Sequence, residues 1–228
     1  MIAPSPIYED GNPWLMFCGV DEAGRGPVIG PLVVACVYVE DDSSLVEIGV
    51  KDSKKLSPKV RERMYQQIID SAADYSIVIK DASSIDALMS RMSLNDIERE
   101  MFAEACSKRR TDAVYADCPD VDENRFSVTL SSMVQGPNII GKHKADDTYP
   151  VVSAASILAK VTRDRLVEEI AETLGKDIGS GYPSDEKTME FIRTWFCEKH
   201  ELPPHVRRSW EPIKKLLMLS KNTRITDW

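Results

Sequence analysis

Two apolar segments near the N-terminus constrain the fold more than any other part of the sequence. Residues 15–20 and 28–39 are both rich in strand-forming residues, and only the seven residues 21–27 separate them. The longer segment contains Gly30 and Pro31 and is too short to cross a bilayer, which excludes a membrane span. The two segments therefore predict neighbouring strands of a sheet inside a globular domain.

The rest of the chain alternates between short apolar segments and longer amphipathic ones. Further strands are predicted at 75–80, 113–116, 126–130 and 138–141, and helices at 57–73, 93–110, 151–174, 184–200 and 207–219. Because strands come early and helices cluster late, we expect an α/β fold with a C-terminal helical extension. Pro203-Pro204 is the best internal boundary, and it separates a main domain over 1–202 from an extension and tail over 203–228.

Charge and cysteine content narrow the classes of function. The net charge of −8 argues against a protein that coats nucleic acid without specificity, but it leaves room for a nuclease whose acids hold metal ions. No two of the five cysteines form a C-x-x-C pair, so we expect them to fill the core rather than bind zinc or form disulfides. The N-terminus has no basic segment followed by an apolar one, so a reducing, cytoplasmic location is expected.

Acidic residues follow three of the apolar segments. Asp21 and Glu22 come directly after the first predicted strand, Asp117 ends another, and Asp146 and Asp147 follow a third. Carboxylates at strand ends can meet at one edge of a sheet, where they suit Mg²⁺ ions that activate water for phosphodiester cleavage. A single such acid more often caps a turn or helix, but the adjacent pair beside a Gly-Arg-Gly turn favours the metal site. The pattern alone does not choose between Asp146 and Asp147.

The remaining reactive residues do not suggest a protein nucleophile. His143, His200 and His205 are too few and too scattered for a histidine-rich metal site, and no Ser-His-Asp or Cys-His arrangement is evident. Contact with a substrate and a solvated loop position are equal alternatives for His143. The absence of such an arrangement in the sequence therefore favours attack by water as the mechanism.

Four motifs in a fixed order carry a resemblance to a known family. They are Gly19-Val-Asp-Glu-Ala-Gly-Arg-Gly-Pro27, Lys51-Asp-Ser-Lys-Lys-Leu-Ser57, Lys144-Ala-Asp146 with Tyr149-Pro-Val-Val-Ser-Ala-Ala-Ser-Ile-Leu-Ala-Lys160, and Gly179-Ser-Gly-Tyr-Pro183. Together they make the chain resemble the type 2 ribonucleases H (ribonuclease HII), most of all the archaeal branch, over about residues 15 to 210. The resemblance implies a ribonuclease H-like mixed sheet flanked by helices.

The resemblance also implies a catalytic set and a reaction. Asp21, Glu22, Asp117 and Asp146 would be the catalytic residues and the ligands of Mg²⁺ or Mn²⁺, which leaves Asp147 as a surface acid. The sequence around Asp117 matches the family more loosely than the other motifs. Such enzymes hydrolyse the RNA strand of RNA–DNA hybrids and cut at single ribonucleotides in duplex DNA, which leaves 5′-phosphate and 3′-hydroxyl ends.

Recognition of RNA requires contact with the 2′-hydroxyl. By resemblance, the main chain of Gly24, Arg25 and Gly26 and the side chain of Tyr182 would make this contact, since glycine lets the backbone approach closely. A turn tyrosine before proline is the alternative for Tyr182. The candidate phosphate contacts, each of which is as easily a solvated or packing residue, are Lys51, Ser53, Lys54, Lys144, Ser153, Ser156 and Lys160.

The C-terminal segment and the fold itself leave alternatives open. Asn222–Trp228 resembles a degenerate sliding-clamp peptide, with a frayed tail as the equal alternative, and the chain is otherwise expected to be a monomer. A nonenzymatic nucleic-acid or clamp-binding adaptor on the same fold is the second reading, because a fold does not guarantee activity. A nuclease or transposase of the wider ribonuclease H-like group is the third.

Overall fold

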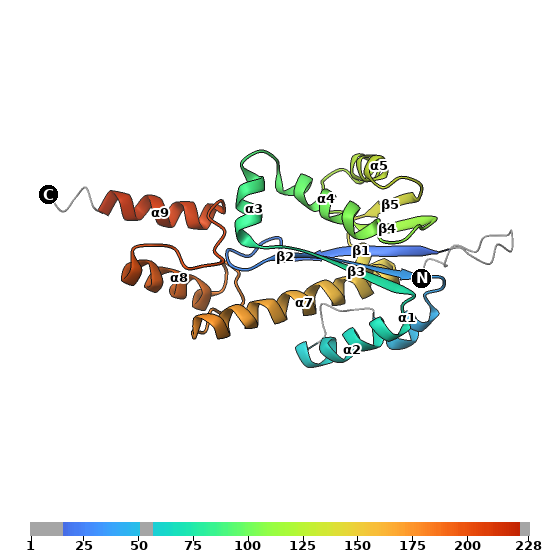
Figure 1. The fold of residues 1–228 in the computed structure, drawn as a ribbon, viewed down its shortest axis with the longest axis horizontal. Helices are drawn as coiled ribbons and strands as arrows, with labels where there is room; N and C mark the ends of the chain where they lie inside the picture. Colours follow the sequence, from blue (N-terminus) through green and yellow to red (C-terminus); the bar gives the residue numbers. More distant parts are fainter. Residues whose placement is uncertain (1–15, 51–56, 224–228) are drawn as a thin grey trace. The chain divides into compact units, whose positions relative to one another are not determined.

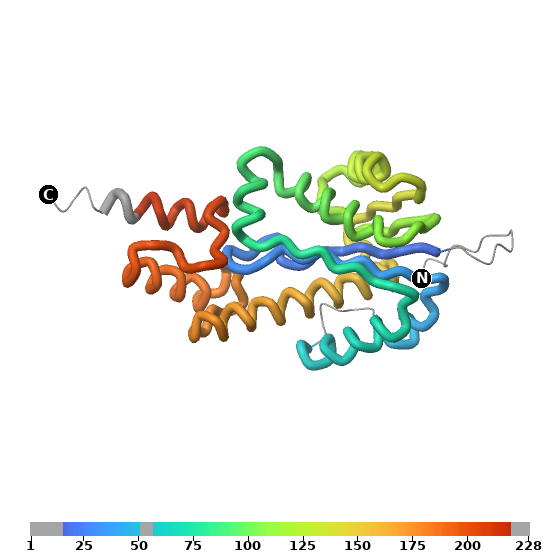
Figure 2. Tube along the Cα trace, in the orientation of Figure 1, coloured from blue at the N-terminus to red at the C-terminus, as the bar shows by residue number. Residues whose placement is uncertain are grey.

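The computed structural model describes residues 16–50 and 57–223, and Figure 2 follows their Cα trace. Side chains are described to residue 219. The chain forms two compact units. The first comprises residues up to 23 together with 33–78 and 94–162, and the second comprises 24–32, 79–93 and the chain from 163 onward. The predicted boundary at 202/203 lies inside the second unit, and a functional division at that point stays a prediction.

A mixed sheet runs through the first unit (Figure 1). Its strands, among the described residues, are β1 (Phe17–Ala23), β2 (Leu32–Val39), β3 (Asp74–Lys80), β4 (Ala113–Asp117) and β5 (Asn138–Lys142). They follow the order β3-β2-β1-β4-β5, with β1 antiparallel to β2 and parallel to β4, and with β4 parallel to β5. This arrangement confirms the predicted mixed sheet of a ribonuclease H-like fold.

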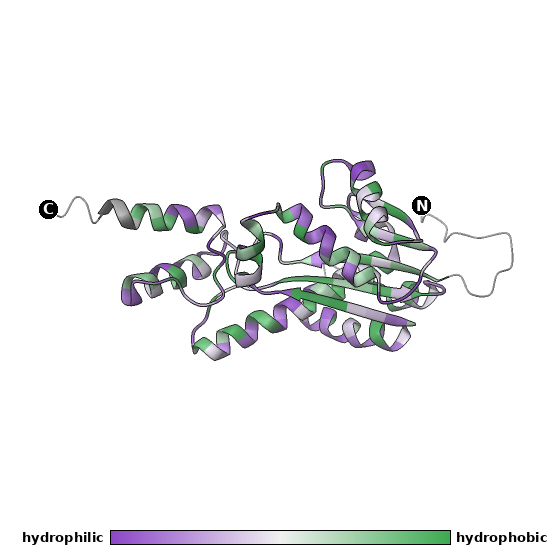
Figure 3. Cartoon of the chain, turned by 45° about the horizontal axis from the view of Figure 1, so that its top comes forward, coloured by the Kyte–Doolittle hydropathy of each residue, from purple (hydrophilic) through white to green (hydrophobic). Residues whose placement is uncertain are grey.

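Burial explains why the two N-terminal apolar segments become central strands. All eight residues of β2 are buried. Green, hydrophobic segments recur along the strands of the sheet in Figure 3. Every residue of β1 except Glu22 is also buried, and the strand contains Gly19, where an added Cβ would lie 2.4 Å from the main chain of Val151. The absence of a side chain at Gly19 therefore lets the start of α7 (Pro150–Leu174) pack directly against β1.

The helices have the following bounds. They are α1 (Ser43–Ile48), α2 (Pro58–Ser71), α3 (Ala82–Met89), α4 (Leu94–Cys106), α5 (Glu123–Met133), α6 (Ala145–Thr148), α7 (Pro150–Leu174), α8 (Glu186–Lys199) and α9 (Glu211–Thr223). In the first unit, α4 and α5 lie on one side of the sheet and α1 and α2 on the other (Figure 1). The predicted helices are confirmed, although the last begins at Glu211 rather than at 207, and α1, α3 and α6 were not predicted.

The strand predicted at 126–130 is wrong, because this segment lies inside α5. The alternation of apolar and polar residues suits a strand, but Phe126 and Leu130 are also one helical turn apart, and both are fully buried. Val128, between them, points outward and is 72% exposed. The carboxylate of Asp122 caps the helix by accepting hydrogen bonds from two main-chain N–H groups of its first turn.

The second unit has an apolar core of its own. It joins the loop between β1 and β2 to the end of α7, to α8 and to α9, through Val28, Ile29, Val167, Ile170, Ile178, Met189, Ile192, Leu202, Val206 and Ile213. Ile29 and Val206 also form an isolated antiparallel bridge. The loop that carries the Gly-Arg-Gly sequence is therefore anchored by segments from the C-terminal third of the chain.

Two further expectations can be compared with the described residues. None of the helices within the described ranges is long and apolar enough to cross a membrane. The thiols of Cys18, Cys36, Cys106 and Cys118 are buried, whereas Cys197 is exposed, so the expectation of a core position is wrong for Cys197.

Candidate active site

The sheet brings three acidic side chains together in the first unit. Asp21 and Glu22 lie on β1, and Asp117 is the last residue of β4. Because β1 and β4 are parallel neighbours with Val20 opposite Ala116, the acids that follow these residues emerge at the same edge. Ligand oxygens of the three carboxylates lie within 4.8 Å of one another. We refer to Asp21, Glu22 and Asp117 as the acidic group.

The carboxylate of Asp146 is not part of the acidic group, but the residue before it, Ala145, is hydrogen-bonded to the group. The main-chain N–H of Ala145 donates to Oδ1 of Asp117 at 2.8 Å, and Asp146 is the next residue. Asp146 is only 4% exposed, whereas Asp147 is exposed. Burial thus separates two acids that the residue pattern alone could not distinguish.

The acidic group is electrostatically crowded. Burial raises the pKa of Asp21 well above its ordinary value, and the negative charges of Glu22 and Asp117 act in the same direction. Hydrogen bonds from the Ser156 hydroxyl and from the main-chain N–H of Glu22, the latter 2.7 Å long, oppose this shift. Three carboxylates so close to one another disfavour full ionisation unless a cation compensates them.

The donor set fits a hard divalent cation. All the ligand atoms of the acidic group are carboxylate oxygens, which Mg²⁺ and Mn²⁺ prefer over softer donors. No histidine or cysteine belongs to this group, and His143 is exposed. The three carboxylates of the acidic group therefore suit the metal ions that the sequence motifs imply.

The predicted recognition residues lie together in the second unit. Gly24 has φ 97°, and an added Cβ there would lie 2.5 Å from the carbonyl oxygen of Pro31, so the turn requires glycine. A Cβ on Gly26 would meet the ring of Tyr182 at 3.5 Å. The Gly24–Gly26 turn and the half-buried Tyr182 are therefore neighbours, as the resemblance implies.

Comparison with known proteins decides the family. The sequence model described as ribonuclease HII matches residues 18–213. The chain belongs to the ribonuclease HII family. It is thus a metal-dependent endoribonuclease, a hydrolase of phosphodiester bonds, rather than a nonenzymatic adaptor.

Individual members of the family match nearly the whole chain. Ribonuclease HII of Thermococcus kodakarensis is 48% identical over 208 residues, which cover 89% of this chain and 90% of that protein. The solved structure of ribonuclease H2 from Pyrococcus horikoshii OT3 has a TM-score of 0.84 at 41% identity, covering 88% of this chain and 96% of the other. The solved PCNA:ribonuclease HII complex from Archaeoglobus fulgidus gives a TM-score of 0.82 at 40% identity, covering 86% and 94%.

The candidate phosphate contacts of this enzyme differ in solvent exposure and in hydrogen bonding. Lys144 is exposed and Lys160 is partly exposed, which suits contact with a nucleic-acid backbone. Ser153 is fully buried and donates to the carbonyl of Val50, a position that does not suit the predicted phosphate contact. Ser156 instead donates to Asp21, so it supports the acidic group. The other predicted contacts, Lys51, Ser53 and Lys54, lie outside the described residues.

Two arginines of the second unit were missed by sequence reasoning. Arg163 on α7 and Arg207 before α9 are 1% and 0% exposed, although arginine is ordinarily a surface residue. The sequence gives one hint that Arg207 is buried, because it follows Val206 and precedes Trp210 by three positions. The sequence around Arg163 gives no such hint. Both arginines contact the loops that carry the predicted recognition residues.

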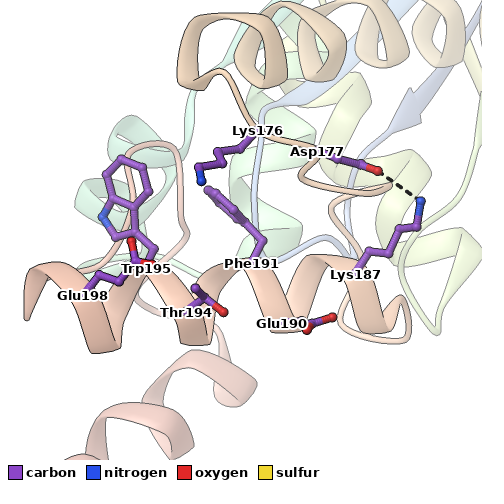
Figure 4. Close-up of a pocket in the computed structure, with 8 residues that line it drawn as sticks. All are labelled: Lys176, Asp177, Lys187, Glu190, Phe191, Thr194, Trp195 and Glu198. Carbon is purple, nitrogen blue, oxygen red and sulfur yellow. Dashed lines mark hydrogen bonds and ion pairs between the residues drawn. The ribbon is translucent and has the colours of Figure 1, made fainter.

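A hollow on α8 contains none of the predicted site residues (Figure 4). Its volume is about 270 Å³, and its lining consists of Lys176, Asp177, Lys187, Glu190, Phe191, Thr194, Trp195 and Glu198. Lys187 forms an ion pair of 3.0 Å with Asp177 across part of this lining. Charges of both signs are mixed there, so the hollow presents neither a cluster of acids for metal nor a basic surface for phosphates.

Proposed function

We propose that this ribonuclease hydrolyses the RNA strand of RNA–DNA hybrids and cuts at single ribonucleotides embedded in duplex DNA. The products would carry 5′-phosphate and 3′-hydroxyl ends. The observation that carries the proposal is the convergence of Asp21, Glu22 and Asp117 at one edge of the sheet, within a chain of the ribonuclease HII family. The chain needs no protein nucleophile for this reaction.

In the proposal the four acids bind metal, and neighbouring groups orient two of them. Asp21, Glu22, Asp117 and Asp146 would hold Mg²⁺ or Mn²⁺ ions, which activate water and stabilise the leaving oxygen when bound. Ser156 fixes the orientation of Asp21, and the N–H of Ala145 fixes that of Asp117 at 2.8 Å. Because these partners are held by helices and strands, the carboxylates keep their positions without substrate.

The second unit would supply recognition of the ribose. The main chain of Gly24, Arg25 and Gly26 can approach a 2′-hydroxyl closely, and Tyr182 beside Gly26 can pack on the sugar. Lys144 and Lys160 would contact phosphates without reading sequence. Contacts by Lys51, Ser53 and Lys54 stay predictions.

We also propose that the C-terminal segment Asn222–Trp228 binds a sliding clamp. The segment lies almost wholly outside the described residues, and support comes from its sequence and from a related protein solved in complex with PCNA. A pull-down with the cognate clamp should retain the intact chain but not a chain that ends at Ser220. Equal retention would end this proposal. A monomeric state and a cytoplasmic location stay predictions.

Cleavage of a duplex that contains one ribonucleotide tests the proposed activity. With Mg²⁺ or Mn²⁺ we expect a single cut at the ribonucleotide and a new 5′-phosphate, and the same DNA without the ribonucleotide should remain intact. A chelator should abolish the cut. Cleavage that persists without metal, or that ignores the ribonucleotide, would contradict the proposal.

A further inference from the structure

Arg207 connects the C-terminal part of the chain to the turn that carries Gly24. Its side chain is completely buried. Its Nη2 donates to the carbonyl of Gly24 at 2.6 Å, across 183 positions of sequence, and its Nη1 donates to the carbonyl of Arg25 at 3.2 Å. One guanidinium group therefore holds the carbonyls of two consecutive residues of the turn.

The same residue also fixes the other end of the loop. Nε of Arg207 donates to the carbonyl of Gly30 at 3.0 Å, and its main-chain N–H donates to the carbonyl of Val28 at 2.8 Å. The carbonyl of His205 in turn accepts from the N–H of Gly30 at 2.9 Å. The loop from Gly24 to Gly30 is thus bound at both ends by a single short segment.

Among the described residues, the guanidinium of Arg207 forms no ion pair with a carboxylate, although the negative charge of Asp86 acts to raise its pKa. Its guanidinium donates to main-chain carbonyls and lies 4.7 Å from the centre of the Trp210 ring. Burial lowers the pKa of Arg207 to about 9, and the nearby charge of Arg163 acts in the same direction, so the group stays protonated at neutral pH. Only the planar, forked donors of arginine can reach three carbonyls at once, which lysine cannot reproduce.

Arg163 contacts the loop that carries Tyr182, as Arg207 contacts the turn that carries Gly24. It is 1% exposed, its Nη2 donates to the carbonyl of Ser180 at 2.9 Å, and its guanidinium lies 5.0 Å from the centre of the Tyr182 ring. An added Cβ at Gly24 would also approach the side chain of Arg163 at 2.9 Å. Each of the two arginines therefore holds one of these loops through its main-chain carbonyls.

We propose that Arg207 is a positioning residue for ribose discrimination, which holds the Gly24–Gly26 main chain in its substrate-reading form while Arg163 holds Tyr182. The inference rests on the proposed function of this turn. It makes the segment after Pro203-Pro204 part of substrate selection rather than an accessory extension. Preorganisation of this kind lowers the cost of binding because the loop needs no ordering when substrate arrives.

Substitution of Arg207 tests this role against a purely structural one. We would compare Arg207→Met and Arg207→Lys with Arg208→Met, which alters the exposed neighbouring arginine. The readout is a preference ratio, defined as the dissociation constant for an all-DNA duplex divided by that for the same duplex with one ribonucleotide, both measured in Ca²⁺. The kcat and KM for cleavage are measured alongside it. Thermal melts verify that each variant is folded.

Arg207→Met should lower the ratio at least tenfold and raise KM, Arg207→Lys should restore little of it, and Arg208→Met should stay within twofold of the wild type. A folded Arg207→Met with the wild-type ratio, or full rescue by lysine, would overturn the proposal. If Arg207→Met does not fold, Trp210→Leu keeps the hydrogen-bonding group but removes its ring partner. A reduced ratio in that variant supports the role, and an unchanged ratio overturns it.

Amide hydrogen exchange separates this proposal from the proposed function. Exchange at residues 24–30 should accelerate in Arg207→Met but not in Arg208→Met, whatever the activity of the enzyme. If the wild type neither cuts at nor prefers the ribonucleotide, the proposed function fails. Unchanged exchange in Arg207→Met would instead refute the positioning role, even in an active enzyme.

Discussion

The acidic group in the first unit and the arginine-held loops in the second, residues 24–30 and 180–182, solve opposite electrostatic problems. In the acidic group, three carboxylates lie close together, and burial together with their mutual repulsion raises the pKa of Asp21. In the loops, two buried guanidinium groups donate to main-chain carbonyls and lie against aromatic rings, and Arg163 also pairs with Asp164 at 3.5 Å. The first region concentrates negative charge that a cation would compensate, whereas in the second the positive charges already have partners within the chain.

This difference indicates a division between chemistry and selection. A region that needs metal can be inactive until the ion binds, and its side chains must lie on rigid strands to bind it well. A region that reads a sugar must keep its shape before substrate arrives, which internal hydrogen bonds ensure. Substitutions in the two regions should therefore fail in different ways.

The largest effect is expected at the centre of the acidic group. Asp21→Asn removes one charged ligand and should lower single-turnover cleavage at least a thousandfold, or about 4 kcal/mol, because metal-assisted charge stabilisation is worth several kcal/mol. Binding of hybrid should remain largely intact, since the loops are unchanged. Wild-type rates in this variant would remove Asp21 from the site, and a matching loss of binding would erase the distinction between the two regions.

Asp146 and Asp147 form a matched pair for the next prediction. Asp146→Asn should reduce cleavage about a hundredfold or more, because it removes a buried acid next in sequence to Ala145, whose main-chain N–H binds Asp117. Asp147→Asn changes an exposed neighbour and should leave the rate within about twofold of the wild type. Steady-state cleavage assays on both variants measure the contrast. Equal rates would exclude a special role for Asp146.

Substitution of Tyr182 should impair substrate selection, as expected for the arginine-held loops. Tyr182→Ala is expected to weaken cleavage at isolated ribonucleotides about tenfold, near the low end of values for stacking on a nucleotide, and to affect long hybrids less. Tyr182→Phe keeps the ring near Arg163 and isolates the contribution of the hydroxyl. Rates on the two substrates provide the measurement. An equal loss on both would contradict a role in sugar recognition.

Asp74 provides a carboxylate with the opposite environment and the smallest expected effect. Hydrogen bonds from Lys108 and Arg109, each 2.7 Å long, lower the pKa of Asp74 to about 2. Its stabilising contribution should be present above about pH 4, the ordinary pKa of aspartate, and should vanish as the pH falls toward about 2. Both basic partners are about half exposed, so Asp74→Asn should cost at most about 1 kcal/mol at pH 7.

Urea denaturation of the wild type and Asp74→Asn at a series of pH values tests this sign. The difference in free energy of unfolding should shrink between pH 5 and 3, within about the range where unfolded aspartate becomes protonated. A difference that grows as the pH falls would show that the ion pairs do not stabilise the fold.

The acidic group was accessible to sequence reasoning because its signals are local. Asp21 and Glu22 end an apolar segment, and Asp117 ends another, so strand prediction places them where they can meet, and the parallel pairing of β1 with β4 brings them together. The role of Ser156 was not accessible, because its hydrogen bond to Asp21 depends on the close approach of α7 to β1 at Gly19.

The arginine-held loops were less accessible because they depend on long-range burial. Apart from the apolar and aromatic neighbours of Arg207, nothing local marks Arg163 or Arg207 as interior residues, and their carbonyl partners lie in remote segments. The error at 126–130 has a related cause, since an alternating pattern of five residues also fits a helix with two buried positions. In both cases tertiary packing, rather than local pattern, decides the outcome.

A titration with Mn²⁺, followed by the electron paramagnetic resonance signal of the free ion, tests most directly whether the acidic group holds divalent cations. The wild-type protein should deplete the free signal, and Asp21→Asn should need at least about ten times more protein for the same depletion, since one charged ligand is lost. Equal binding by the two proteins, or none by the wild type, would contradict the account.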